Sequence, residues 1–106
     1  MHQILSQAKA LSSQLQEWFC QLHRHPELGR QEHQTQMWIL AELKKMNIEA
    51  TPIAGTGVLA IIRGEKPGKT VALRSDMDAL PVQEETGLPY ASEIDGVMHA
   101  CATMPI

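Results

Sequence analysis

The sequence is short of cysteines and long apolar runs, and both shortages exclude classes of protein. Its two cysteines, Cys20 and Cys101, lie far apart and form no disulfide-framework pattern, so we expect reduced thiols in a cytoplasmic protein. No apolar run approaches the roughly 20 residues that a membrane-spanning helix needs. The N-terminus, Met1-His2-Gln3, lacks the basic and apolar regions of a secretory signal.

An excess of basic charge is also missing. The nine lysines and arginines are scattered, and the net charge is −3 at pH 7. This charge gives no electrostatic footprint for nucleic acid or an anionic membrane surface. With 106 residues, 43% of them hydrophobic and 20% charged, the chain has the composition of one small globular domain.

Two segments have the apolar spacing of amphipathic helices. In residues 3–22 apolar side chains recur every three or four positions, at Ile4, Leu5, Ala8, Leu11, Leu15, Trp18, Phe19 and Leu22. Within that stripe we interpret Trp18 and Cys20 as packing residues, in preference to a cofactor contact or a reactive thiol. The second predicted helix covers residues 31–46 and stops at Asn47; its buried stripe is Trp38, Ile39, Ala41, Leu43 and Met46.

Three strands are predicted after the helices, at residues 48–53, 58–63 and 70–74. Pro52 favours an edge position for the first, and the third is apolar enough to be buried on both faces. This order predicts an α/β fold in which helices cover a sheet. The third strand leads directly into a polar segment, and ligands usually bind at such strand ends.

Three stretches contain candidate functional residues. His23, His25 and Glu27 could bind a metal ion from an extended segment, but Pro26 and Gly29 equally indicate a structural turn, which spacing alone favours.

Asp76 and Asp78 alternate along the chain, so their carboxylates share a side and could bind a cation or orient a metal-binding histidine. An Asp pair that caps a turn explains them equally well. His99 and Cys101 are good ligands for zinc, manganese or nickel, although two residues do not make a site.

Taken together and in order, these stretches resemble the M20 family of metallopeptidases and amidohydrolases. The likeness is greatest to the branch with hippurate hydrolases, N-acyl-amino-acid amidohydrolases, N-acetyldiaminopimelate deacetylases and auxin-conjugate hydrolases. The matching blocks are His23-Arg24-His25-Pro26-Glu27-Leu28-Gly29, Gly55-Thr56-Gly57-Val58, Val71 to Pro81 (with Asp76-Met77-Asp78-Ala79-Leu80-Pro81), Glu84 to Tyr90, and Gly96 to Cys101 (with Met98-His99-Ala100-Cys101).

The resemblance implies that residues 1–106 are the N-terminal portion of a zinc-peptidase-like catalytic domain, incomplete, with two helices followed by strands of a mixed sheet. It implies a two-metal hydrolase that cleaves the amide bond of N-acyl amino acids, with zinc, manganese or nickel lowering the pKa of a bridging water. Cys101 matches a metal ligand of the family. Asp78 is a possible acidic residue that supports the site, and Asp76 is a weaker candidate for the same role. The catalytic glutamate and the smaller dimerisation domain are expected downstream.

The likeness stops after Cys101. The family continues with Gly-His-Asp, whereas this chain continues with residues 102–106, so Thr103 stands where a second ligand is expected. Deleting one G from GGC CAC GAT GCC CAT (Gly-His-Asp-Ala-His) gives GCC ACG ATG CCC AT-, which encodes Ala-Thr-Met-Pro and, with T, C or A as the next base, Ile, the sequence of residues 102–106. We therefore expect an out-of-frame tail at residues 102–106 and a chain that is inactive by itself.

Two functions remain open at this point. In the first, the chain is part of an amidohydrolase that acts on a small N-acyl amino acid and binds neither nucleic acid nor membrane. In the second, it is a small non-enzymatic binding module built on the start of that fold. The density of motifs favours the first.

Overall fold

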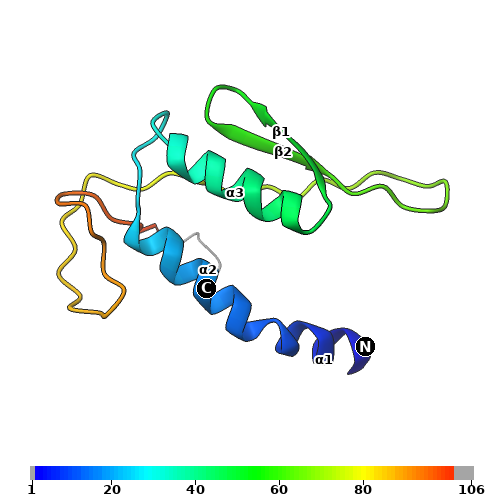
Figure 1. Ribbon diagram of the computed structural model, residues 1–106, viewed down its shortest axis with the longest axis horizontal. Coiled ribbons are helices and arrows are strands. Elements are labelled where there is room, and N and C mark those ends of the chain that lie inside the picture. The colour runs from blue at the N-terminus through cyan, green and yellow to red at the C-terminus, as the bar shows by residue number, and fades with distance from the viewer. Residues whose placement is uncertain (1, 102–106) are drawn as a thin grey trace.

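The computed structural model describes residues 2–101, which form three helices and one β-hairpin (Figure 1). The elements are α1 (His2–Ala10), α2 (Ser12–Arg24), α3 (His33–Lys45), β1 (Glu49–Ile53) and β2 (Gly57–Ile61). This is a small α/β arrangement, as predicted. No helix among residues 2–101 is long and apolar enough to cross a membrane.

The predicted helix at residues 3–22 is divided into α1 and α2, so the prediction of a single helix was wrong. The break lies at Leu11, whose amide donates a hydrogen bond to Ala8 O at 3.1 Å, three residues back. Ser12 and Ser13 follow, and serine hydroxyls compete for backbone hydrogen bonds that would otherwise continue a helix. No residue of α1 is buried, so packing does not oppose the break.

Helix α3 confirms the second predicted helix, with ends shifted by one or two residues. Asn47 ends it as expected: its φ of 57° lies in the left-handed region that asparagine tolerates. Its backbone amide donates to Lys44 O at 3.0 Å, which satisfies one of the last carbonyls of the helix. The predicted stripe is covered in part, because Trp38 is half-buried and Met46 remains 44% exposed.

Strands β1 and β2 confirm the first two predicted strands. They pair antiparallel from Glu49 opposite Ile61 to Ile53 opposite Gly57. α3 contacts both strands, and the Gln36 side-chain amide donates to the carbonyls of Gly55 and Gly57, at 3.0 and 2.8 Å. The hairpin is therefore fixed to α3 at its turn as well as along its strands.

The third predicted strand is not formed, and the expectation that it is buried on both faces was wrong. Val71 is 82% exposed and Leu73 is 97% exposed. A strand needs a neighbour to hydrogen-bond its backbone, and the sheet in the described part of the chain contains only β1 and β2. Without a pairing strand or a covering helix, residues 70–74 run extended through solvent.

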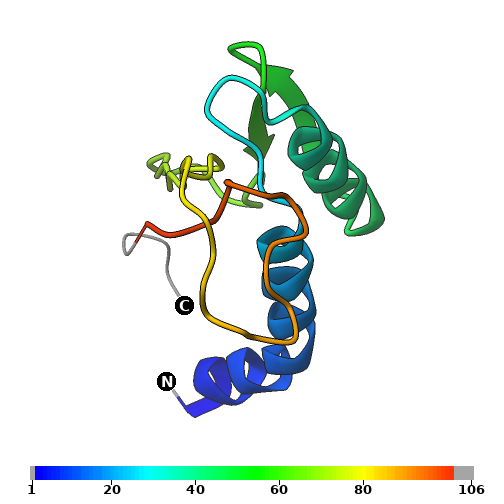
Figure 2. The same cartoon turned by 90° about the vertical axis from the view of Figure 1, so that its left-hand side faces the viewer.

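A second, smaller ladder joins three distant segments. Leu28 pairs parallel with Ala79, and Leu80 pairs antiparallel with Met98. Ala79 is only 3% exposed and is the buried aliphatic residue at the centre of this ladder. The loop that leaves the ladder after Leu80 runs beside α2, in orange in Figure 2, and the Glu93 amide donates to Arg24 O at 2.9 Å.

Candidate functional site

The small ladder brings two of the sequence candidates together. The Ala79 amide donates to Glu27 O at 2.8 Å, and Leu80 and Met98 exchange backbone hydrogen bonds of 2.9 and 3.0 Å. These bonds place Asp78 and His99 on adjacent segments, directly beside the ladder. Because residues 27–29, 78–80 and 98–101 are far apart in sequence, the ladder is what gathers them.

Gly29 leaves room for the Asp78 side chain. A Cβ built at Gly29 would lie 3.7 Å from Asp78 Oδ2, an ordinary contact that places the carboxylate directly against this backbone. Asp76, in contrast, pairs with Arg74 at 2.8 Å on an exposed part of the chain. The two aspartates therefore have different surroundings, although their alternation puts them on one side of an extended chain.

His99 is the unusual polar residue of the site. Both ring nitrogens are buried, and neither has a partner at hydrogen-bond geometry among residues 2–101. Burial lowers the pKa of His99 below its ordinary value, the nearby charge of His23 lowers it further, and Asp78 opposes the shift. The imidazole is therefore neutral at pH 7, which is the state that can accept a hydrogen bond or donate a lone pair.

A buried carboxylate, Glu84, connects the long loop to α2. Its Oε1 lies 2.8 Å from His23 Nε2, and their side chains are 3% and 8% exposed. The same carboxylate accepts hydrogen bonds from the Ser92 amide at 2.9 Å and from the Thr86 hydroxyl. Burial raises the pKa of Glu84, but these hydrogen bonds and His23 outweigh it, and the pKa is lowered overall.

Aromatic rings close around His23. Phe19 stacks on the imidazole with centroids 5.8 Å apart, and Tyr90 meets the same ring edge-on at 5.7 Å. Phe19 and Tyr90 also contact each other, at 5.9 Å. The loop is thus held to α2 by an apolar cluster around a polar pair.

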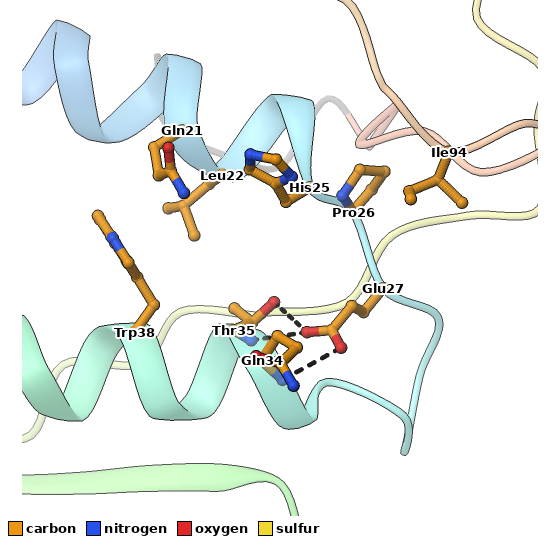
Figure 3. Close-up of a pocket in the computed structure, with 9 residues that line it drawn as sticks. All are labelled: Gln21, Leu22, His25, Pro26, Glu27, Gln34, Thr35, Trp38 and Ile94. Atoms are coloured by element: carbon orange, nitrogen blue, oxygen red, sulfur yellow. Dashed lines mark hydrogen bonds between the residues drawn. The ribbon is translucent and has the colours of Figure 1, made fainter.

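Glu27 stabilises the start of α3. Its carboxylate accepts hydrogen bonds from the Thr35 amide and hydroxyl, both at 2.6 Å, and from the Gln34 amide at 3.1 Å (Figure 3). These amides belong to the first turn of the helix, where unpaired donors and the helix dipole favour a negative charge. Burial raises the pKa of Glu27, but the bonds from Thr35 and Gln34 lower it overall.

His23, His25 and Glu27 therefore do not share one site, and each side chain has a different partner. His23 binds Glu84, His25 lies 3.5 Å from Glu93 at the surface, and Glu27 caps α3. The structural interpretation of this stretch, which its spacing favoured, accounts for all three side chains. Sequence reasoning missed Thr35 entirely, and Glu84 and Tyr90 entered only through the family resemblance.

A pocket of about 400 Å³ lies between α2 and α3. Figure 3 shows Leu22 and Trp38 facing each other across it, with the Glu27 cap at one end; its lining is Gln21, Leu22, His25, Pro26, Glu27, Gln34, Thr35, Trp38 and Ile94. The polar groups of Glu27, Gln34 and Thr35 at its end already hydrogen-bond to one another. They are therefore not available to bind or activate a ligand in this pocket.

The donor set is incomplete for a metal ion. Among residues 2–101 no three His, Cys, Asp or Glu side chains are grouped closely enough to hold one. Cys101 is exposed at the end of the described range, and Thr103 and the predicted out-of-frame tail lie outside the described residues. Asp78, His99 and Cys101 are thus candidate contributors to a metal site that needs further donors.

The fold is a small α/β arrangement in which one small ladder brings the segments of Asp78 and His99 together. Residues 72–104 match the model of peptidase family M20/M25/M40. The chain belongs to this family.

Relatives of known sequence agree. The chain is 46% identical over 94 residues to thermostable carboxypeptidase 1 of Saccharolobus solfataricus, covering 83% of this chain and 24% of the relative. It is 52% identical over 81 residues to the N-acetyl-L-cysteine deacetylase of Bacillus subtilis, covering 76% and 20%.

Among solved structures, the Bacillus subtilis YxeP protein, described as a dinuclear metal-binding peptidase of family M20, matches with a TM-score of 0.83. The two sequences are 45% identical, and the match covers 88% of this chain and 27% of that one. The chain thus spans only about a quarter of the length of the proteins that it matches.

Proposed function

We propose that the chain is the N-terminal part of the catalytic domain of a metal-dependent amidohydrolase that cleaves the amide bond of N-acyl amino acids. The similar proteins include an N-acetyl-L-cysteine deacetylase and an N-acetyldiaminopimelate deacetylase. Both names describe removal of an acyl group from the nitrogen of an amino acid. Zinc, manganese or nickel would serve as the divalent metal.

The observation that carries this proposal is the meeting of Asp78 and His99 at the small ladder, inside the segment that matches the family model. Their segment leads directly to Cys101. We assign Cys101 as a metal ligand and Asp78 as an acidic residue that supports the site, with Asp76 the weaker candidate because Arg74 already occupies it.

The proposal also covers domain organisation. Residues 1–106 form part of one catalytic domain, with residues 102–106 an out-of-frame tail and the dimerisation domain encoded downstream. Because no three donors are grouped among residues 2–101, the 106-residue chain is expected not to hydrolyse N-acyl amino acids. The longer protein read in the neighbouring frame is expected to do so.

The test is to sequence the locus beyond codon 106 and to express both products. We expect the neighbouring frame to encode Gly-His-Asp and the rest of the hydrolase, and the longer product to release amino acid from N-acetyl and N-benzoyl amino acids. A chelator should abolish this release and an added divalent metal should restore it. Hydrolysis by the 106-residue chain itself, or a longer product without metal-dependent amidase activity, would contradict the proposal.

A further inference from the structure

Residues 80–98 form a closed loop, and the candidate site lies at its neck. At the neck Leu80 and Met98 exchange backbone hydrogen bonds of 2.9 and 3.0 Å. Asp78 lies two residues before the neck and His99 one residue after it. Because a single bridge forms the neck, the placement of Asp78 relative to His99 also depends on what holds the rest of the loop.

Glu84 joins the two halves of this loop from inside. Its carboxylate accepts hydrogen bonds from the Ser92 amide at 2.9 Å and from the Thr86 hydroxyl. Closer to the neck, the Gly96 amide donates to the side-chain oxygen of Gln83 at 2.7 Å. The outgoing and returning halves are therefore one connected unit, with the Glu84 carboxylate as its main junction.

His23 attaches this unit to the end of α2, beside which the loop runs in Figure 2. Its Nε2 lies 2.8 Å from Glu84 Oε1, and both side chains are buried. Glu84 is ionised at pH 7, since its pKa is lowered from 4.5. An ionised carboxylate only accepts hydrogen bonds, so His23 Nε2 is the donor. A charge-assisted bond of this kind is among the stronger hydrogen bonds in proteins.

Two backbone contacts accompany that attachment. The Glu93 amide donates to Arg24 O at 2.9 Å, and the Ala79 amide donates to Glu27 O at 2.8 Å. Such backbone bonds do not require particular side chains. The bond between His23 and Glu84 does require them, and it is therefore the attachment that the sequence specifies.

We propose that His23 and Glu84 are positioning residues of the amidohydrolase site, whose hydrogen bond fixes the loop on α2 and thereby holds Asp78 and His99 in one arrangement. Both side chains are buried and already paired, so they act through the loop and not by contact with substrate. This inference rests on the proposed function and adds two residues to it. Substitution of residues that orient a metal site without ligating the metal typically lowers metal affinity or activity by about 10–100-fold.

The 106-residue chain tests the positioning without any hydrolysis. His23→Leu should speed hydrogen exchange of the Leu80 and Met98 amides by about tenfold or more and shift the ring resonances of His99, because the loop loses a buried charge-assisted bond. His23→Gln should leave both nearly unchanged, because its side-chain amide supplies a donor in place of Nε2. Glu85→Gln, at an exposed neighbour of Glu84, is the matched control and should change neither.

The longer product read in the neighbouring frame tests the effect on the reaction. His23→Leu should lower kcat for an N-acetyl amino acid by about tenfold or more, while KM changes less than about threefold, because His23 does not touch the substrate. His23→Gln should restore kcat to within about threefold of the unmodified protein. Thr35→Ala is the control for a merely structural effect, since it weakens the Glu27 cap of α3 and should leave kcat unchanged.

The outcomes distinguish this inference from the proposed function. If no longer product hydrolyses N-acyl amino acids, the proposed function fails, and exchange and ring resonances in the short chain still decide the positioning. Unchanged exchange at the neck in His23→Leu, equal kcat in His23→Leu and His23→Gln, or an equal loss of kcat in Thr35→Ala would each overturn the proposal. If His23→Leu loses its helical circular dichroism, Glu84→Gln takes its place: it keeps the size and the acceptor oxygen but removes the charge, and it should change neck exchange in the same direction.

Discussion

The carboxylate of Glu27 accepts hydrogen bonds from both the backbone amide and the hydroxyl of Thr35, each at 2.6 Å. Glu27 lies in the connection after α2, and Thr35 in the first turn of α3, so the contact fixes the position of one helix relative to the other. Thr35 is 5% exposed, which makes its hydroxyl one of the few buried polar groups in the described part of the chain.

Thr35→Ala is expected to lower the free energy of unfolding by about 1–2 kcal/mol, because it removes a charge-assisted hydrogen bond and leaves part of the Glu27 carboxylate unsatisfied. Urea denaturation followed by circular dichroism measures this. Thr51→Ala, at an exposed position of β1, should change stability far less. Equal effects of the two variants would mean that the contact with Glu27 does not contribute.

Stability should fall in acid. The pKa values of Glu27 and Glu84 are both lowered from 4.5 in the folded chain. The unfolded chain therefore binds protons at a higher pH than the folded chain does. The resulting stabilisation is complete above about pH 4.5 and is lost as the pH falls through the two lowered pKa values. Urea midpoints at pH 7, 5, 4 and 3 should show this decrease, and Thr35→Ala should make it smaller.

Glu84→Ala is expected to destabilise the chain by about 2–3 kcal/mol, since it leaves His23 and the Ser92 amide without their partner inside a buried cluster. The neighbouring Glu85 is exposed, so Glu85→Ala provides the control. Hydrogen exchange at residues 84–92 should also increase in Glu84→Ala, because the loop loses its attachment to α2. Unchanged exchange there would show that the aromatic contacts hold the loop by themselves.

Cys101 is expected to bind cobalt(II) more tightly once a second donor is present. Changing Ala102→Gly and Thr103→His supplies an imidazole two residues away. A thiolate ligand should then give a sulfur-to-cobalt charge-transfer absorption band in the near ultraviolet. Cys101→Ser should remove this band, and Cys20→Ser should retain it. A band that survives Cys101→Ser would assign the thiolate to Cys20 and contradict the site.

The sequence predicted local structure well where the signal was local. The period of α3, its stop at Asn47 and the hairpin turn before Gly57 all depend on residues near one another in the chain. The break at Leu11 was missed because the apolar stripe continues across it. The strand at residues 70–74 was predicted from its apolar side chains, but a strand forms only beside a partner, and composition cannot report whether one is present.

The candidate site was predictable only as separate pieces. Asp78, His99 and Cys101 were each visible as possible ligands, yet only the bridges at Ala79 and Leu80 show that the first two share one location. The contact between His23 and Glu84 spans 61 residues of sequence, and no local pattern indicates it. The metal-ligand interpretation of His23, His25 and Glu27 could be weighed against a turn but not decided without their partners.

The exposed segment from Ile61 to Asp76 also determines where a protease would first cleave the chain. It contains Arg63, Lys69 and Arg74 at exposed positions outside the helices and strands, and exposed loop segments are the preferred sites of proteolysis. Trypsin should therefore nick the chain there first. The two pieces need not separate, because the bridge of Leu28 to Ala79 and the pair of His23 with Glu84 both join residues before the nick to residues after it. The nicked chain would then be a non-covalent complex of two peptides, whose reassembly after separation measures how much of the fold these contacts sustain.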